Sequence, residues 1–429
     1  MTNSELMIRD LAHIWHPCTQ MKDHEAIPII PIKEAKGIYL YDFDGNRYID
    51  GISSWWVNLF GHRNEYINMR IKEQLERLEH VIFAGFTHEQ IVRLSERICE
   101  LTGMQKCFYA DNGSSAVEVA LKMSFHYFKN EGKTKPYFVS LTNSYHGETL
   151  GALAVGDVEL YKDTYKEIMI KTLQAPVPRD RSEEATDEAI AALRDLFKEY
   201  NDQISAFIVE PLVQCAGYMH MYAPSYLKKA KELCEEYEIF FIADEIAVGF
   251  GRTGTMFAYE QAGIKPDFVC LSKGLTGGYL PLSIVLTTDR VYNKFYCDYN
   301  EFKAFLHSHS YTGNALACAA ANATLDIFEQ EDVLAKNQEK IAFMAKKLEK
   351  FKELPNVKEV RQTGMIAAVE LQGYEAKQRI GLQVNQKALQ KGVFIRPLGN
   401  VIYFMPPYVI TFEELAYLID TVYAIVKEL

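Results

Sequence analysis

The feature that most constrains the fold is an alternation of short apolar runs with helical segments between Met104 and Val285. Pro224 opens one of these segments, which is amphipathic and predicts a crossover helix. Such alternation is typical of an α/β protein with a large, mostly parallel sheet and helices on both faces. The six apolar runs are Lys106–Ala110, Tyr137–Leu141, Ala206–Glu210, Phe240–Asp244, Phe268–Ser272 and Ser283–Leu286.

The C-terminal part of the chain has a different pattern. An apolar repeat within residues 336–354 predicts a surface helix, and two short strands are expected within 392–406. Thr411 and Glu414 have capping-box spacing before a final helix. Helices mixed with short strands indicate a smaller α+β domain.

A chain of 429 residues is too long for one simple core. We predict a large α/β domain at 61–319 and a small α+β domain at 320–429. Residues 1–60 are expected to form an N-terminal segment that joins the small domain and the active site.

The charge and cysteine content exclude several classes of partner. A formal net charge of -11 argues against nucleic acid, which requires a basic surface. No stretch predicts a signal peptide or a membrane span. The eight cysteines show no metal-ligand spacing, so we expect reduced thiols, no metal and a cytoplasmic location.

Polar residues follow the apolar runs, where ligands bind in open α/β sheets. The turn Asp111–Ser115 precedes a helical segment, and its backbone N–H groups could bind a phosphate or simply cap the helix. Tyr145, after the second run, could stack on a flat ring or merely close a turn with His146.

Two charged residues end later runs. Asp244 closes a buried run, and its carboxylate needs a cation or strong donor, such as a protonated pyridine nitrogen. Lys273 lies among small residues, where a lysine can lose its proton and attack an aldehyde, although many such lysines only cap a strand. The combination of phosphate turn, aromatic, Asp and Lys on successive strand ends favours chemistry over these structural alternatives.

With these residues the chain resembles the class III aminotransferases of fold type I, which depend on pyridoxal 5′-phosphate. The resemblance covers nearly the whole chain and implies that fold, that cofactor and amino-group transfer. The segments that carry it are Asn112–Glu118, Tyr145–Gly147, Ile242–Ile246, Gly249–Gly254, Leu271–Gly274 and Tyr311–Asn314.

The resemblance implies a role for each matching residue. Gly113 and Ser114 would bind the cofactor phosphate, and Tyr145 would stack on the ring. Asp244 would pair with the ring nitrogen, and Lys273 would form the covalent link to the cofactor and transfer protons. These roles make Lys273, Asp244 and Tyr145 the expected catalytic residues.

The resemblance also implies a homodimer. In this family a phosphate ligand comes from the partner subunit, through the stretch that matches His309 and Ser310. The active site is therefore expected at the subunit interface.

Within the class, the chain is most similar to the subfamily that aminates 8-amino-7-oxononanoate to 7,8-diaminononanoate in biotin synthesis. Trp55 and Trp56 would wall a pocket for a long aliphatic chain, and Arg396 would bind its terminal carboxylate. As alternatives, paired tryptophans are commonly core and such an arginine is commonly in a surface ion pair. The similar segments are Ile14–Pro17, Gly51–Trp56, His307–Asn314 and Ile395–Tyr403.

Three departures affect the expected amino donor. Cys18 stands where the subfamily usually has tyrosine, Ser308 where it has glycine, and His309 where it has proline. The last two are similar to a branch that uses lysine. We predict S-adenosylmethionine, because an aromatic wall at Trp55 and Trp56 suits an adenine face and a sulfonium cation, with lysine as the alternative. Cys18 and Ser308 are expected among the substrate-binding residues.

Two further functional hypotheses are open. The nearer is a class III transaminase acting on ω-amino acids, ornithine or 4-aminobutyrate; Trp55, Trp56 and Arg396 argue against it. The more distant is a catalytically silent protein of this fold that serves as a binding module. Lys273 together with Asp244 argues against that second hypothesis.

Overall fold

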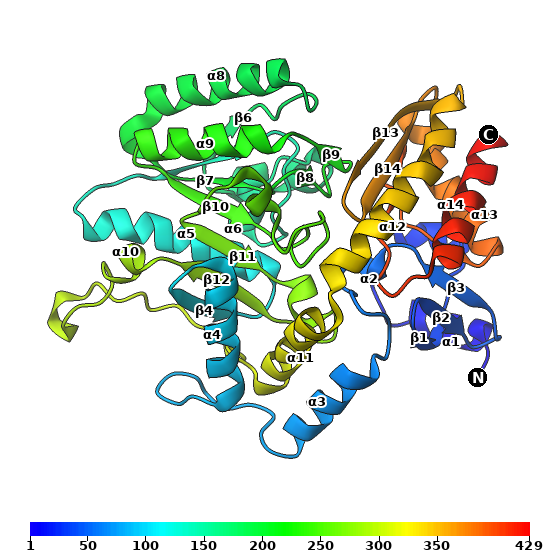
Figure 1. Ribbon diagram of the computed structural model, residues 1–429, viewed down its shortest axis with the longest axis horizontal. Helices are drawn as coiled ribbons and strands as arrows, with labels where there is room; N and C mark the ends of the chain where they lie inside the picture. Colours follow the sequence, from blue (N-terminus) through cyan, green and yellow to red (C-terminus); the bar gives the residue numbers. More distant parts are fainter.

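The computed structural model describes residues 1–429, and its centre is a seven-stranded sheet in the order β4-β12-β11-β10-β7-β5-β6 (Figure 1). All six predicted apolar runs form strands of this sheet, and β6 is an additional edge strand that the sequence pattern did not indicate. The strands are β4 (Lys106–Ala110), β5 (Tyr137–Leu141), β6 (Leu173–Ala175), β7 (Ile204–Val209), β10 (Phe240–Asp244), β11 (Phe268–Leu271) and β12 (Ser283–Thr287).

The sheet is mostly parallel, as predicted, with one exception. Strand β12 runs antiparallel to both of its neighbours, β4 and β11. Strand β10 pairs in parallel with β11 and β7, and β5 pairs in parallel with β7 and β6. The carboxyl ends of β4, β11, β10, β7 and β5 therefore meet at one edge of the sheet.

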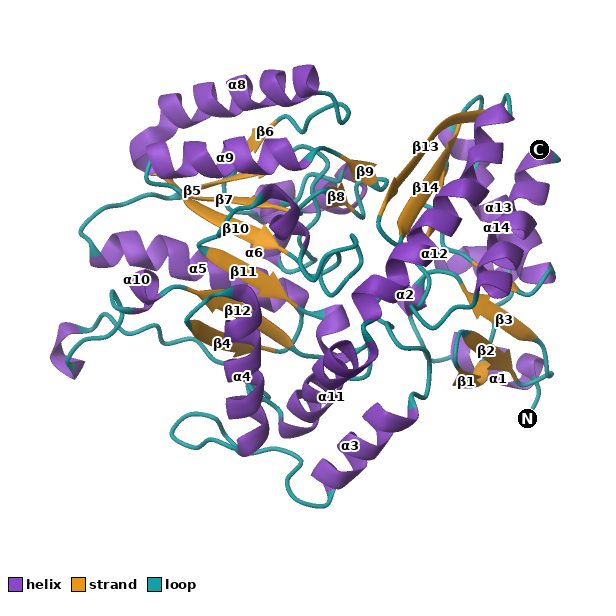
Figure 2. Cartoon of the chain, in the orientation of Figure 1, coloured by secondary structure: helices purple, strands orange, loops and turns teal.

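Alternate residues of the strands belong to two different cores, one on each face. In β10, for example, Phe240 and Ile242 pack into one core while Phe241 and Ala243 pack into the other. Figure 2 shows the resulting layers of helices around the sheet. None of the helices has the length and apolar character that a membrane span requires. One core includes α5 (Gly113–Asn130) and α6 (Leu150–Val155); the other includes α4 (Glu89–Thr102), α8 (Glu183–Tyr200), α9 (Pro224–Glu236) and α11 (Ala315–Glu331).

The predicted crossover helix is α9. Pro224 occupies its first turn, where the missing N–H costs no hydrogen bond. Tyr226, Ala230, Leu233 and Cys234 are buried along one face, which confirms the amphipathic pattern.

A second unit contains the C-terminal helices α12 (Val333–Leu348), α13 (Ile380–Gln390) and α14 (Phe412–Lys427) around an antiparallel sheet. Thr411 and Glu414 form the predicted capping box of α14. The two strands expected within 392–406 are present, but they join different sheets and are not a paired hairpin. The antiparallel sheet consists of β13 (Val357–Thr363), β14 (Ile366–Leu371) and β16 (Val401–Phe404).

The N-terminal segment is attached to this second unit. Strand β15 pairs in parallel with β3, so residues near the start and the end of the chain share a sheet. Figure 1 shows both termini on this side of the molecule. The domain boundaries themselves stay a prediction, and the one at 319/320 would fall within α11. This sheet contains β1 (Ile32–Lys36), β2 (Tyr39–Asp42), β3 (Arg47–Asp50) and β15 (Val393–Phe394), beside α1 (Asn3–Leu11).

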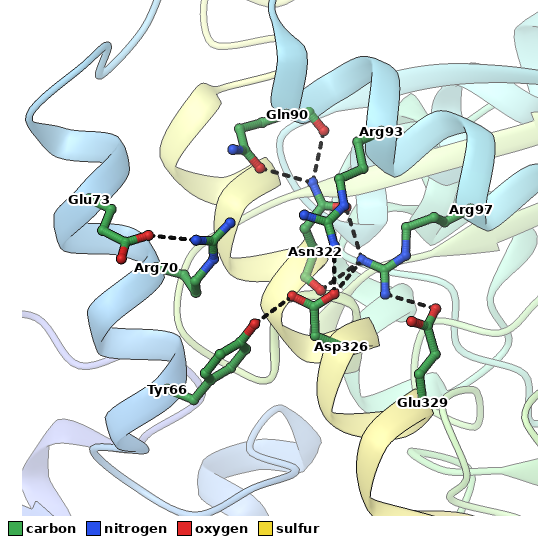
Figure 3. A network of polar contacts seen from close by, with 9 residues as sticks. All are labelled: Tyr66, Arg70, Glu73, Gln90, Arg93, Arg97, Asn322, Asp326 and Glu329. Carbon is green, nitrogen blue, oxygen red and sulfur yellow. Dashed lines mark hydrogen bonds and ion pairs between the residues drawn. The ribbon is translucent and has the colours of Figure 1, made fainter.

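A polar network fixes α11 against α4 and α3 (Glu65–Leu75), as Figure 3 shows. At its centre the nearly buried carboxylate of Asp326 accepts hydrogen bonds from the Tyr66 hydroxyl and the Arg93 guanidinium, both at 2.8 Å. Arg97 forms an ion pair with the same carboxylate at 3.0 Å. The network holds the helix that follows the segment with His309.

The remaining helices and strands are short: α2 (Ser53–Trp56), α7 (Glu159–Lys162), α10 (Asp289–Tyr292), β8 (Val213–Gln214) and β9 (His220–Met221).

Candidate active site

The shared sheet edge opens into a cavity of about 480 Å³, a volume suited to a small cofactor and substrate. Its walls come from the start of α5, the turn after β5, the end of β10 and the segment after β11. It thus brings together six of the predicted site residues: Trp56, Gly113, Ser114, Tyr145, Asp244 and Lys273.

Asp244 lies at the bottom of this cavity with a side chain that is almost fully buried. Its Oδ1 accepts the backbone N–H of Ile246 at 3.1 Å, and its Oδ2 lies 2.7 Å from Nδ1 of His146. The other ring nitrogen of His146, Nε2, is buried without a hydrogen-bond partner. A buried carboxylate held in this way can bind a protonated ring nitrogen.

Lys273 starts a short 3-10 turn after β11 and has a left-handed backbone with a φ of 48°. Burial lowers the pKa of its ammonium group, and the carboxylates of Asp244 and Glu210 oppose that shift. Its Nζ lies 4.5 Å from the centroid of the Trp56 ring. A lysine with a lowered pKa is more readily the neutral amine that attacks an aldehyde.

The predicted phosphate turn forms the first turn of α5. Asn112 caps the helix by accepting the N–H of Ser115 at 3.1 Å, so the capping alternative is also true. The remaining N–H groups of a first turn have no partner within the helix. Gly147 closes over this turn, and a Cβ there would lie 2.0 Å from Oγ of Ser114. The turn fits a phosphate group.

Tyr145 is fixed through both its backbone and its hydroxyl. Its N–H donates to Oε2 of Glu210 at 3.0 Å, and its hydroxyl donates to Glu148 at 3.0 Å. Burial and, after it, Asp244 raise the pKa of Glu210 well above its usual range. We call Asp244, His146, Lys273 and Glu210 the cavity floor.

Four side chains lie just outside the cavity lining, next to its residues Trp56 and Tyr145, and we call them the cavity mouth: Cys18, Trp55, Tyr161 and Arg396. The guanidinium of Arg396 lies 4.6 Å from the centroid of the Trp55 ring and donates to the backbone oxygen of Cys18 at 3.1 Å. Arg396 makes no ion pair with any carboxylate of the chain. Tyr161 packs edge-on against Tyr145, and burial together with the neighbouring thiol of Cys18 raises the pKa of Tyr161 to about 12.

Besides Cys18, Trp55 and Arg396, three further predicted residues lie outside the cavity lining in the single chain: Ser308, His309 and Ser310. Nδ1 of His309 is 3.4 Å from Oδ2 of Asp111, at the start of the phosphate turn. Ser308 and Ser310 are exposed, and the backbone oxygen of Ser310 contacts His80. Their contribution to a partner's site stays a prediction.

Comparison with known proteins identifies the class to which this site belongs. The chain belongs to the aminotransferase class-III family, whose model matches residues 19–426. Enzymes of this family depend on pyridoxal 5′-phosphate, and the phosphate turn, Asp244 and Lys273 fit its phosphate, ring nitrogen and aldehyde. The protein is a pyridoxal-phosphate-dependent aminotransferase of fold type I, as predicted.

Individual relatives within this family share a more specific name. The chain is 56% identical to the adenosylmethionine-8-amino-7-oxononanoate aminotransferase of Helicobacter pylori, over 98% of this chain and 97% of that protein. The crystal structure of the Methanocaldococcus jannaschii enzyme of the same name is 38% identical, with a TM-score of 0.96 over 99% of each chain. An omega transaminase of Pseudomonas jessenii, solved in complex with PMP, is 28% identical with a TM-score of 0.93, over 97% of this chain and 96% of that one.

Sequence analysis missed several residues that the geometry places at the site. The floor residues His146 and Glu210 lie within the segments Tyr145–Gly147 and Ala206–Glu210, but neither was predicted to be a site residue. The signal that could have identified Glu210 is a glutamate at the end of an apolar run. No signal marked Tyr161, which reaches the mouth from α7, a short helix without a recognisable pattern.

Proposed function

We propose that this aminotransferase transfers an amino group to the ketone of 8-amino-7-oxononanoate and so forms 7,8-diaminononanoate for biotin synthesis. The observation that carries the proposal is Arg396, an arginine without an ion pair that lies against Trp55 at the mouth of the cavity. An unpaired guanidinium in this position suits the terminal carboxylate of a long keto acid. The name shared by the relatives supports the same acceptor.

The floor supports the chemistry of such a transfer. When bound, the cofactor supplies an aldehyde that receives the amino group and a ring that accepts electrons. Asp244 holds a proton on the ring nitrogen, and His146 orients the Asp244 carboxylate. Nζ of Lys273 removes the proton from the α-carbon of the donor and returns a proton during the exchange.

The mouth supports the choice of acceptor. Trp55 and Trp56 provide apolar surface for an aliphatic chain, and Arg396 would hold the carboxylate at its far end. Tyr145 and Tyr161 add aromatic surface on the way to the floor. A long keto acid would thus place its ketone near Lys273 with its charged end outside.

For the donor we infer S-adenosylmethionine. The aromatic surface of Trp55 suits its adenine and its sulfonium cation, and the names of the relatives specify adenosylmethionine. Cys18, Ser308 and His309 favour lysine instead, because they depart from the usual subfamily pattern.

Each donor can be tested in a half-reaction. The enzyme loaded with pyridoxal 5′-phosphate is mixed with S-adenosylmethionine or with lysine, and absorbance follows conversion of the cofactor to its amine form. We expect conversion by S-adenosylmethionine, followed by its reversal on addition of 8-amino-7-oxononanoate. Conversion by lysine alone would overturn the donor, and failure of the keto acid to reverse it would overturn the acceptor.

We also infer a homodimer in the cytoplasm. A segment that includes His309 exposes several large apolar side chains, which a second copy would cover. All eight cysteines are free thiols, which supports a reducing compartment. Sedimentation would test the dimer. The exposed apolar residues of this segment are Tyr296, Tyr299, Phe302, Leu306 and Tyr311.

A second candidate is an ω-amino acid transaminase. The similarity to the omega transaminase of Pseudomonas jessenii favours it, although the identity of 28% is half that to the Helicobacter pylori protein. A biotin auxotroph that lacks the amination of 8-amino-7-oxononanoate separates the two functions. We expect growth without biotin when this chain is expressed, and the second candidate predicts none.

A further inference from the structure

The segment with the paired tryptophans has an unusual backbone. Four consecutive residues without a glycine, Ser53 to Trp56, all have a positive φ, at 53°, 47°, 75° and 72°. Side chains other than glycine disfavour this left-handed region, and it is normally visited by single residues. A left-handed turn of four such residues needs other contacts to hold it.

This left-handed turn aims two rings at two different parts of the site. The Trp56 ring faces Nζ of Lys273 at 4.5 Å, and its Nε1 donates to the Tyr403 hydroxyl at 3.1 Å. The neighbouring Trp55 ring faces the guanidinium of Arg396 at 4.6 Å. In a strand, two consecutive side chains would point to opposite faces of the sheet. In this turn, the Trp55 ring instead faces the mouth residue Arg396, and the Trp56 ring faces the floor residue Lys273.

One buried carboxylate holds the turn. Oδ1 of Asp50 accepts the N–H groups of Ile52 and Ser54, at 3.4 and 2.9 Å. Its Oδ2 accepts the Ser54 hydroxyl at 2.7 Å and lies 2.9 Å from Nε2 of His62. The Asp50 side chain has no exposed surface, so these partners take the place of water.

His62 is itself anchored. Its backbone N–H and carbonyl pair with Gly37, at 2.7 and 3.0 Å. Its Nδ1 lies 3.3 Å from the amide of Asn58, just beyond the turn. His62 therefore links the Asp50 carboxylate to the backbone of Gly37, before the turn, and to the side chain of Asn58, after it.

We propose that Asp50, oriented by His62, is a positioning residue for the transamination. By fixing the left-handed turn, Asp50 positions both the Trp56 ring, which faces Lys273, and the Trp55 ring, which faces Arg396. The part of the inference that concerns Arg396 rests on the proposed function, whereas the part that concerns Trp56 and Lys273 does not.

The opposite interpretation is that Asp50 only stabilises the fold, and Asp42 offers a matched control. Asp42 is also a buried aspartate that ends a strand of the same sheet, and its carboxylate accepts the N–H groups of Asp44 and Asn46, at 3.0 and 2.8 Å. It also accepts the Tyr48 hydroxyl at 2.9 Å. Its turn contributes no residue to the cavity.

The experiment compares Asp50→Ala, Asp50→Asn and Asp42→Ala in the enzyme loaded with cofactor. Both half-reactions are measured, and near-ultraviolet circular dichroism of the cofactor-free protein follows the tryptophan bands. Only three tryptophans are present, so a Trp15→Phe background removes the exposed one and leaves Trp55 and Trp56.

Asp50→Ala is expected to lower kcat/KM in both half-reactions by at least about tenfold, since small displacements at a reacting centre are costly, and to weaken the tryptophan bands. Asp50→Asn keeps an oxygen for the two backbone N–H groups. It should therefore recover part of kcat/KM and part of the intensity of the tryptophan bands. Asp42→Ala should lower the melting temperature while leaving kcat/KM and the bands unchanged.

Equal behaviour of Asp50→Ala and Asp42→Ala would overturn the proposal, as would tryptophan bands that are insensitive to Asp50. If Asp50→Ala does not fold, Ser54→Ala, which removes only the hydroxyl contact to Oδ2, gives the same test with a smaller expected effect. Failure of the proposed acceptor would appear in the parent enzyme as absence of reaction with the keto acid. The donor half-reaction and the tryptophan bands would still test Asp50.

Discussion

The cavity floor and the cavity mouth are built in different ways. The floor consists of buried groups at the ends of strands of one sheet, where Asp244 ends β10 and Lys273 follows the neighbouring strand β11. The mouth combines Cys18 and Trp55 of the N-terminal segment with Tyr161 and Arg396 from distant parts of the chain. A rigid floor suits the chemistry shared by the family, and loops from several segments suit a particular substrate. Substitutions in the two regions should therefore differ in kind as well as in size.

The largest effect is expected from Lys273→Ala. This change removes the amine that moves the proton, so transamination should be abolished with every donor and acceptor. The phosphate turn and Asp244 are untouched, so cofactor should still bind, which equilibrium dialysis would measure. Near-normal turnover would show that the floor does not carry the chemistry.

Asp244→Asn should be the next most damaging change. An amide cannot hold the ring nitrogen protonated, and we expect a loss of at least a hundredfold in rate, or about 2.7 kcal/mol in the barrier. Single-turnover rates of both half-reactions should fall together. His146→Gln is the control, because its amide can still donate to Oδ2 of Asp244 and should cost less. Wild-type rates with asparagine would exclude Asp244 as the ring partner.

Arg396→Ala should instead separate the two half-reactions. Loss of a charge-assisted pair costs about 1.5–3 kcal/mol, so the KM for the keto acid should rise roughly 10- to 150-fold. The half-reaction with the donor should change much less. Arg379→Ala is a matched control, because that arginine is exposed and already paired with Asp23. Equal damage to both half-reactions would remove the distinction between mouth and floor.

The last prediction concerns stability and not catalysis, at Glu245, which follows Asp244 but belongs to neither region. Its carboxylate accepts the N–H groups of Ala258 and Tyr259, and burial raises its pKa to about 8. A carboxyl group that is harder to ionise in the folded state stabilises the protein fully below its ordinary pKa of 4.5 and loses that contribution as the pH rises through 8.

The free energy of unfolding should therefore fall between about pH 4.5 and 8, by at most about 1.4 kcal/mol per pH unit from this group. Glu245→Gln should remove that slope, although it lowers stability overall because one acceptor is lost. Denaturant titrations at several pH values would measure it. An unchanged slope would show that Glu245 does not titrate in this range.

The floor was more accessible to sequence reasoning than the mouth, for a physical reason. Asp244 closes one short apolar run and Lys273 follows another, and the length and apolar character of such runs are enough to locate them in the sequence. The antiparallel direction of β12 could not be predicted, because a fully buried strand has the same pattern in either direction. Contacts such as that of Cys18 with Tyr161 depend on how distant segments fold over one another, and neither the turn with Cys18 nor the short helix α7 carries a periodic signal.

The place of β12 in the sheet has a consequence for synthesis of the chain. Strand β4, which leads into the phosphate turn, pairs with no strand other than β12, so that Ala110 meets Ser283. A ribosome must therefore complete two thirds of the polypeptide before β4 can dock. Long-range strand pairing of this kind is slow and leaves apolar edges open to aggregation. During translation the phosphate turn should thus be among the last parts of the site to form, and a nascent chain truncated before residue 283 should not retain the cofactor.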